Sequence, residues 1–152
     1  MKTDPGSARE KPAGSRGLLL DTHAFFWMVQ GEARLSRKVV PALLDQAADA
    51  RHLYLSAISI WELAMLESKG RIALGRACQE WVDVALIASR VRIVPLEPEI
   101  SVLSTRLESF PHSDPADRVI AATGILMRLS LITADKALLR YLGEQGNSVL
   151  PL

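Results

Sequence analysis

Cysteine is nearly absent from this sequence, which contains one, Cys78, in 152 residues. A single thiol excludes an internal disulfide framework and any zinc site built from several cysteines. Long apolar runs are also missing, because the longest apolar stretch, residues 53–66, contains Glu62 and is too short to span a membrane. No signal-peptide core precedes Asp21. We therefore expect a cytoplasmic protein without membrane association.

Net charge is small, at +1, so no strong basic field points to a nucleic-acid partner. Residues 1–16 carry four basic and two acidic side chains, which leaves 14 basic and 15 acidic residues of the totals of 18 and 17. Any nucleic-acid binding must then depend on locally placed arginines or on a metal ion. Aromatic residues make up 5% of the chain, and its three tryptophans lie in apolar helical patterns that are typical of a core or an interface.

The chain divides into two parts by composition. Residues 1–16 are rich in proline, glycine, serine and charge and show no periodicity, which is typical of a flexible tail. Residues 17–152 have the length of one ordinary domain. A hydrophobic content of 49% and a mean hydropathy of +0.15 favour a well-packed globular core.

Short apolar runs alternate with helical patterns along residues 17–152. Strands are predicted at 17–20, 53–55, 91–94, 131–133 and 148–150, and helices at 22–29, 37–50, from 56 or 59 to about 66, 76–88, 98–107, 115–129 and 136–142. This alternation predicts an α/β fold in which helices cover both faces of a parallel sheet of four to five short strands. The expected architecture is a three-layer α/β/α domain.

Four carboxylates lie near the predicted helix starts, far apart in the sequence: Asp21, Glu62, Asp117 and Asp135. In an open α/β sheet, ligands bind beyond the carboxyl ends of the strands, near the point where the strand order reverses. Unpaired carboxylates gathered there would raise one another's pKa values, and a divalent cation with oxygen ligands would relieve the repulsion. Such an ion also lowers the pKa of water and neutralises a phosphodiester. The pattern therefore indicates metal-dependent phosphodiester chemistry.

Each acid taken alone is better explained as a helix cap. Asp21 and Asp135 directly precede predicted helices, Ser59-x-x-Glu62 has the form of a capping box, and Asp117 lies in the first turn of its helix. Serine, threonine or asparagine would cap as well, however. Acids at all of these places, three of them at one edge of the sheet, favour a metal site when they are taken together.

Four segments of the sequence carry a family resemblance. They are Leu20-Asp21-Thr22-His23-Ala24-Phe25-Phe26-Trp27, Ser56-x-x-Ser59-x-Trp61-Glu62, His112-x-Asp114-Pro115-x-Asp117-Arg118-x-Ile120-Ala121-Ala122 and Leu131-Ile132-Thr133-x-Asp135. In this order and at this spacing they resemble a PIN domain, and more narrowly the VapC-type toxins of bacterial toxin–antitoxin pairs. The match covers the chain from about residue 17 to its end.

The resemblance implies a magnesium-dependent endoribonuclease (Mn²⁺ as an alternative ion) that leaves 5′-phosphate and 3′-hydroxyl ends on RNA. It also implies a homodimer that is inhibited by an antitoxin, bound as an amphipathic helix with an arginine in the acidic pocket. On this mapping, Asp21 and Asp117 are the first choices for metal ligands. Glu62 and Asp135 would complete the site through water or orient the attacking water. The Thr133 hydroxyl is expected to hold the Asp135 loop by a hydrogen bond.

Four further polar residues lie next to these positions in the sequence. Asp114 could face the site, but a capping role is favoured. His23 and His112 flank the acids, where a hydrogen-bonded structural role is favoured over a general base. Arg118 is predicted either to neutralise an RNA phosphate or to pair with a carboxylate.

Two other functions compete with the nuclease. A phosphoryl-transfer domain with an aspartyl nucleophile would need a second acid two residues after Asp21, where the sequence has His23. A non-catalytic PIN-like scaffold that only binds RNA or a protein would be expected to have lost at least one of the four acids. The presence of all four favours the enzyme.

Overall fold

The computed structural model describes residues 17–31 and 53–152, so the predicted tail at 1–16 and the predicted helix at 37–50 lie outside the described residues. The strands are β1 (Leu18–Leu20), β2 (Leu53–Ser56), β3 (Arg92–Val94), β4 (Ser130–Thr133) and β5 (Val149–Pro151). The helices are α1 (Thr22–Gln30), α3 (Ala57–Ser68), α4 (Cys78–Ser89), α5 (Pro98–Ser104), α6 (Pro115–Met127) and α7 (Lys136–Glu144). None of these described helices is long and apolar enough to cross a membrane.

All five strands form one parallel sheet in the order β3-β2-β1-β4-β5. The chain builds β1, β2 and β3 outward in one direction and then returns to place β4 on the other side of β1. The strand order therefore reverses between β1 and β4, which is where open α/β sheets bind ligands. The predicted fold class and parallel sheet are confirmed.

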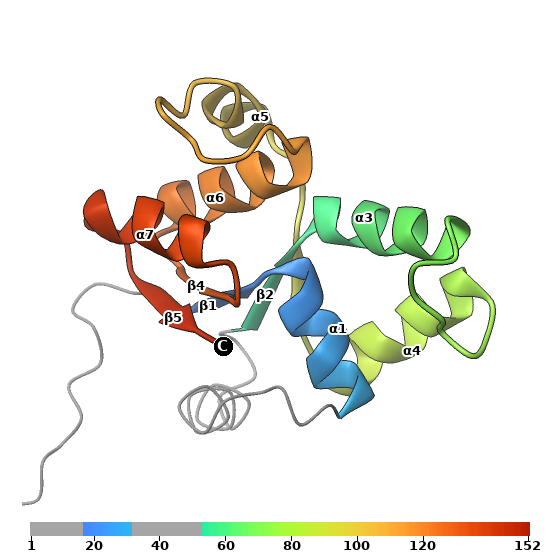
Figure 1. Cartoon of the computed structure of the whole chain (residues 1–152). Helices are drawn as coiled ribbons and strands as arrows, with labels where there is room; N and C mark the ends of the chain where they lie inside the picture. Colours follow the sequence, from blue (N-terminus) through green and yellow to red (C-terminus); the bar gives the residue numbers. More distant parts are fainter. Residues whose placement is uncertain (1–16, 32–52) are drawn as a thin grey trace, which may run out of the picture.

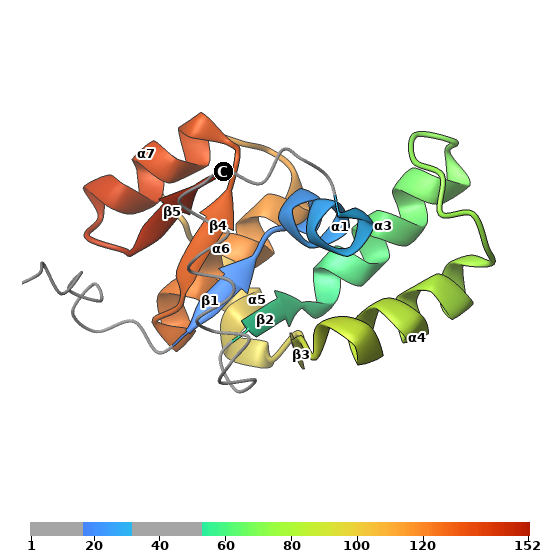
Figure 2. The same ribbon diagram turned by 90° about the horizontal axis from the view of Figure 1, so that it is seen from below.

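The helices cover the two faces of the sheet, as Figure 1 and Figure 2 show. Alternation along β1 sends Leu18 and Leu20 to one face and Leu19 to the other. The first face packs against α1, α3 and α4 through a cluster that includes Phe25, Leu63 and Trp81. The second packs against α6 and α7. The three-layer arrangement follows, because each strand of a parallel sheet must bury both of its sides.

Several helix ends differ from the sequence prediction. The helix α6 stops at Met127 because Arg128 adopts a left-handed conformation (φ 54°), and the N–H groups of residues 128 and 129 bond back to the Gly124 carbonyl. The helix α4 begins at Cys78, two residues later than predicted, and α5 ends at Ser104, three residues earlier. Cys78 is half-buried and packs against the first core.

Gly124 offers a test of the packing between α6 and β1. A Cβ atom added there would lie 3.7 Å from both the Leu19 side chain and the Leu129 carbonyl, which is ordinary van der Waals contact. We predict that Gly124→Ala raises the free energy of unfolding by about 0.5–1 kcal/mol, because glycine is unfavourable inside a helix. The control Gly31→Ala should lower it by about 1–2 kcal/mol, since Gly31 ends α1 at φ 67°. Urea denaturation measures both, and a destabilised Gly124→Ala variant would contradict this packing.

Candidate functional site

Asp21 follows β1 and caps α1, and its two carboxylate oxygens have different partners. Oδ1 accepts a hydrogen bond from the Ala24 N–H at 2.6 Å, while Oδ2 accepts one from the Thr133 hydroxyl at the end of β4. The Asp21 backbone N–H donates to the Ile132 carbonyl at 3.1 Å, which extends the pairing of β1 with β4 by one residue. Asp21 is therefore fixed at the point where the strand order reverses.

Thr133 joins Asp21 to the second acid of this edge, Asp135. Its fully buried hydroxyl accepts a hydrogen bond from the Asp135 N–H at 3.1 Å while it donates to Asp21. The loop contact expected of Thr133 is thus present. Asp135 Oδ1 caps α7 by accepting from the N–H groups of Ala137 and Leu138 at 2.9 and 3.0 Å. Its Oδ2 lies 2.7 Å from Nε2 of His112.

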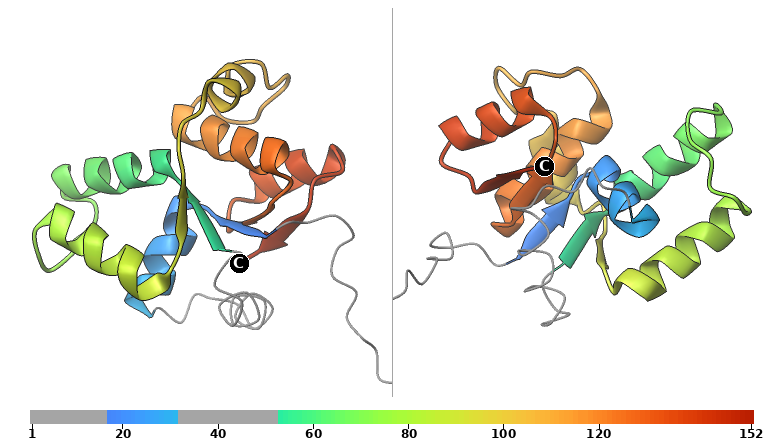
Figure 3. Two further views of the ribbon diagram at one scale, coloured as in Figure 1. Left: turned by 180° about the vertical axis from the view of Figure 1, so that it is seen from behind. Right: turned by 60° about the horizontal axis from the view of Figure 1, so that its bottom comes forward.

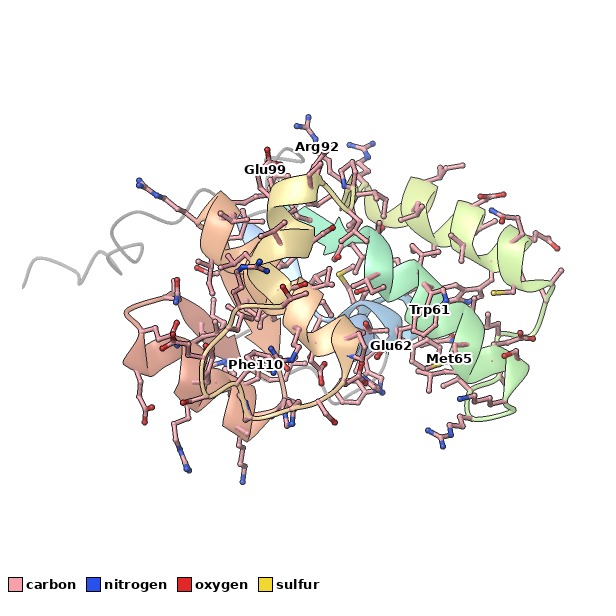
Figure 4. The ribbon with its side chains drawn as sticks, turned by 90° about the horizontal axis from the view of Figure 1, so that it is seen from above. Trp61, Glu62, Met65, Arg92, Glu99 and Phe110 are labelled. Carbon is pink, nitrogen blue, oxygen red and sulfur yellow. The ribbon has the colours of Figure 1, made fainter. Side chains whose placement is uncertain are left out.

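Glu62 reaches the same place from α3, although the capping-box interpretation of Ser59-x-x-Glu62 is wrong. The helix begins at Ala57, with Ser56 as the capping residue. Ser59 is therefore inside the helix, where it accepts a hydrogen bond from the buried Thr22 hydroxyl at 3.0 Å. Glu62, one turn further on, is itself buried. Figure 4 shows it on the side of α3 that faces the starts of α1 and α6.

Asp117 lies in the first turn of α6, whose N-terminus is near α3 in both Figure 1 and Figure 3. Asp114 performs the cap of α6, accepting from the Ala116 N–H at 2.8 Å, as its favoured role required. The Asp117 carboxylate is half-buried. One of its oxygens lies within 4.8 Å of ligand atoms of His112 and Asp135, and the cap of α6 is made by Asp114.

Electrostatic repulsion links Glu62 with both Asp21 and Asp117, and it links Asp117 with Asp135. Burial, followed by repulsion from Asp114, Glu62 and Asp135, raises the pKa of Asp117 to about 6. Burial also raises the pKa of Asp21, with a further rise from Glu62 that the Thr133 and Ala24 hydrogen bonds oppose. Burial acts in the same direction on Asp135, but its hydrogen bonds with Leu138 and His112 outweigh it and keep that pKa below its ordinary value.

His112 makes the hydrogen bond that its favoured structural role implied, and its partner is a site acid, Asp135. Among the described residues, one group of metal-ligand types has its donor atoms all within 4.8 Å of one another, and it consists of His112, Asp117 and Asp135. His23, by contrast, is exposed and packs its ring 5.7 Å from that of Trp27. The position of His112 two residues before the Asp114 cap was the available signal, but it did not distinguish His112 from His23.

Within residues 17–31 and 53–152, Arg118 does not pair with a carboxylate, which was one of the two roles predicted for it. Its guanidinium lies 5.2 Å from the centre of the Phe110 ring and donates to the Ser104 carbonyl at 3.3 Å. No ion pair joins it to a carboxylate within the part of the chain that the structure describes. Its observed contacts support the loop between α5 and α6.

The donor set fits a divalent cation. Carboxylate oxygens are the ligands that Mg²⁺ and Mn²⁺ prefer. Asp117 makes no capping bond, and its high pKa shows that negative charge is costly at this place. A bound cation would reverse that cost. Asp117 and Asp135 are the acids whose oxygens lie close enough to share an ion, and Asp21 is joined to Asp135 through Thr133.

The PIN domain family matches residues 18–143 of this chain. The chain belongs to the PIN-domain family. It is also 35% identical over 121 residues to Ribonuclease VapC22 of Mycobacterium tuberculosis, a match that covers 80% of this chain and 88% of that protein. This relative places the chain among the VapC-type members of the family.

Solved structures share the fold at lower identity. A crystal structure of VapBC2 from Rickettsia felis bound to a promoter DNA fragment contains a chain that is 16% identical, with a TM-score of 0.63 over 89% of this chain and 98% of that one. The crystal structure of FitAcB from Neisseria gonorrhoeae gives 23% identity and a TM-score of 0.58 over 88% and 96%. These likenesses support the architecture described above.

Replacing Thr133 by valine should destabilise the protein by about 1–3 kcal/mol at neutral pH, because Asp21 and the Asp135 N–H both lose a partner. The cost should grow with pH, since the hydroxyl donates to the ionised form of Asp21. Thr133→Ser keeps the hydroxyl and loses a methyl group, so its smaller cost should not vary with pH. Urea denaturation at pH 5 and pH 7.5 in EDTA compares the two. Equal pH dependence of the two variants would contradict the assigned hydrogen bond.

Asp117 should make the metal-free protein less stable as the pH rises. Its pKa is 3.8 ordinarily and about 6 in the fold, so the folded state binds the extra proton and its stabilisation is lost as the pH rises through about 6. Since Asp117 is partly exposed, we predict that Asp117→Asn is more stable than wild type by about 1–2 kcal/mol at pH 7.5 in EDTA. The gain should shrink toward pH 4.

The matched control for this measurement is Asp83→Asn, which changes an exposed acid on α4 that bonds to Gln79. That variant should show no comparable gain at pH 7.5. Loss of stability in Asp117→Asn at pH 7.5 would show that the carboxylate is favourably paired in the metal-free fold.

Proposed function

We propose that this protein is a metal-dependent endoribonuclease and acts as the toxin of a toxin–antitoxin pair. The observation that carries the proposal is the convergence of Asp21, Glu62, Asp117 and Asp135 at the point where the strand order reverses, with Asp117 at a pKa of about 6. The likeness to Ribonuclease VapC22 supports RNA as the substrate class. Mg²⁺ is the proposed ion, with Mn²⁺ as an alternative.

Asp21 and Asp117 would hold the ion directly, and Glu62 and Asp135 would complete the site. When bound, the cation lowers the pKa of water and neutralises charge on the phosphodiester. Asp21 is suited to its role because Thr133 and Ala24 fix both of its oxygens before any ligand arrives. Attack of water on phosphorus with loss of the 3′ oxygen would leave 5′-phosphate and 3′-hydroxyl ends.

The partners follow from the same proposal. We expect a homodimer and an antitoxin whose helix carries an arginine into the acidic site. The exposed Trp61 supports a protein partner near the site. Its side chain is 57% exposed next to Glu62 on α3 (Figure 4), whereas Trp81 of the neighbouring helix α4 is buried in the core.

Cleavage of total RNA by the purified protein tests the activity. Wild type should produce discrete fragments with Mg²⁺ or Mn²⁺ and none in EDTA. Asp21→Asn and Asp117→Asn should reduce cleavage to the level seen in EDTA, while Asp83→Asn on α4 should cleave like wild type. Fragment ends are assigned by ligation that requires a 5′-phosphate.

The outcomes separate this proposal from its alternative. Cleavage that survives EDTA or the loss of Asp21 would contradict the four-carboxylate mechanism. RNA binding without cleavage, by folded protein in the presence of metal and across several RNA classes, would support the non-catalytic scaffold.

A further inference from the structure

The loop between α5 and α6, residues 105–114, is packed against α6 and α7 through one aromatic ring. Phe110 lies under the Arg118 guanidinium of α6, 5.2 Å from its ring centre. On another side it meets Tyr141 of α7 edge to face, with the ring centres 5.0 Å apart. Edge-to-face rings and cation–π contacts each favour a defined geometry. The ring therefore fixes the middle of the loop, which Figure 4 shows around the label of Phe110.

Both partners of Phe110 also bond to the loop or its start. The Tyr141 hydroxyl donates to the Glu108 carbonyl at 3.0 Å. Arg118 donates to the carbonyl of Ser104, the last residue of α5, at 3.3 Å. Between these contacts the backbone turns at Ser109, whose φ of 55° is rare for a residue with a side chain. The loop is thus determined by contacts on several sides.

The consequence of this packing is the position of His112. Its ring lies 6.2 Å from that of Phe110, edge to face, and its Nε2 lies 2.7 Å from Oδ2 of Asp135, 23 residues away in the sequence. Because Oδ1 of Asp135 already accepts from two N–H groups of α7, the contact with His112 fixes the second oxygen. The carboxylate has no free rotation left.

We propose that His112 is a positioning residue of the carboxylate site: carried by the Phe110 loop, it orients Asp135 toward the cation without binding the cation itself. This inference rests on the proposed metal-dependent function. Partners of ligating groups that fix their orientation typically change metal affinity by about 10–100-fold when they are removed.

The geometry favours orientation of Asp135 over direct ligation. Nε2 is the His112 atom that faces Asp135 Oδ2, and a nitrogen that donates its proton to this oxygen has no lone pair for a metal. A ligating imidazole would also discriminate among metals, since it favours Mn²⁺ and later transition metals over Mg²⁺. An orienting imidazole would affect these cations alike. The two roles therefore predict different changes in the ratio of the Mn²⁺ affinity to the Mg²⁺ affinity when His112 is replaced.

Calorimetric titration of the antitoxin-free protein with Mg²⁺ and with Mn²⁺ tests the proposal. His112→Ala should weaken both affinities by a similar factor of about 10–100. His112→Gln, whose amide N–H replaces that of Nε2, should stay within a few-fold of wild type. In an Asp135→Ala background, the His112→Ala change should have no further effect, because the group that His112 orients is gone.

Two further variants keep folding separate from positioning. Phe110→Leu should weaken cation affinity in the same direction as His112→Ala, since it loosens the loop, while Val102→Ser, at an exposed position of α5, should not. Urea denaturation in EDTA confirms that each titrated variant is folded.

The possible failures are distinguishable. Absence of cation binding by wild type would overturn the proposed function itself. If wild type binds the cations and His112→Ala binds them with unchanged affinity, the role of His112 alone is overturned. If His112→Ala loses much more affinity for Mn²⁺ than for Mg²⁺, and His112→Gln does not restore it, His112 is a ligand. That result would also overturn the positioning role.

Discussion

The site depends on one hydroxyl group, that of Thr133. It donates to Asp21 and accepts from the Asp135 N–H, so it joins the residues that follow β1 and β4. These strands are neighbours although more than a hundred residues separate them, and the strand order reverses between them. Because the hydroxyl is fully buried, neither of its hydrogen bonds competes with solvent. The relative position of the two acids is therefore set by the sheet itself and not by mobile loops.

Holding the acids in fixed positions lowers the stability of the metal-free fold, because no cation is present to offset the repulsion between them. Asp21 and Asp117 both have raised pKa values, first because of burial and then because other acids are near. A surface without function would disperse such charges, since each raised pKa lowers the stability of the ionised fold. Charge gathered where hydrogen-bonded oxygens are already oriented suits the proposed cation, whose binding would offset the cost of these buried acids.

Most of the fold could be predicted from the sequence because its strands are short and mostly apolar runs between helical patterns, and the central strand Leu18–Leu20 is wholly apolar. Only a sheet covered on both faces buries such runs. Asp21, Asp117 and Asp135 were equally visible, since each lies beside a helix start, whereas Glu62 lies inside α3. Contacts between distant segments were not. His112 meets Asp135 because Phe110 packs between Arg118 and Tyr141, and no local pattern encodes that meeting. The contacts of Arg118 with Phe110 and Ser104 were hidden for the same reason.

In the sequence, a helix cap and a site residue looked like alternatives, but one aspartate can serve as both. A carboxylate has two oxygens, and in both Asp21 and Asp135 one oxygen caps a helix while the other is directed elsewhere, to Thr133 or to His112. Serine or threonine would satisfy the helix with a single oxygen and leave nothing for the site. Asparagine would offer a donor in place of the second oxygen. The cap thus fixes the direction of the functional oxygen, and both roles require aspartate at the same position.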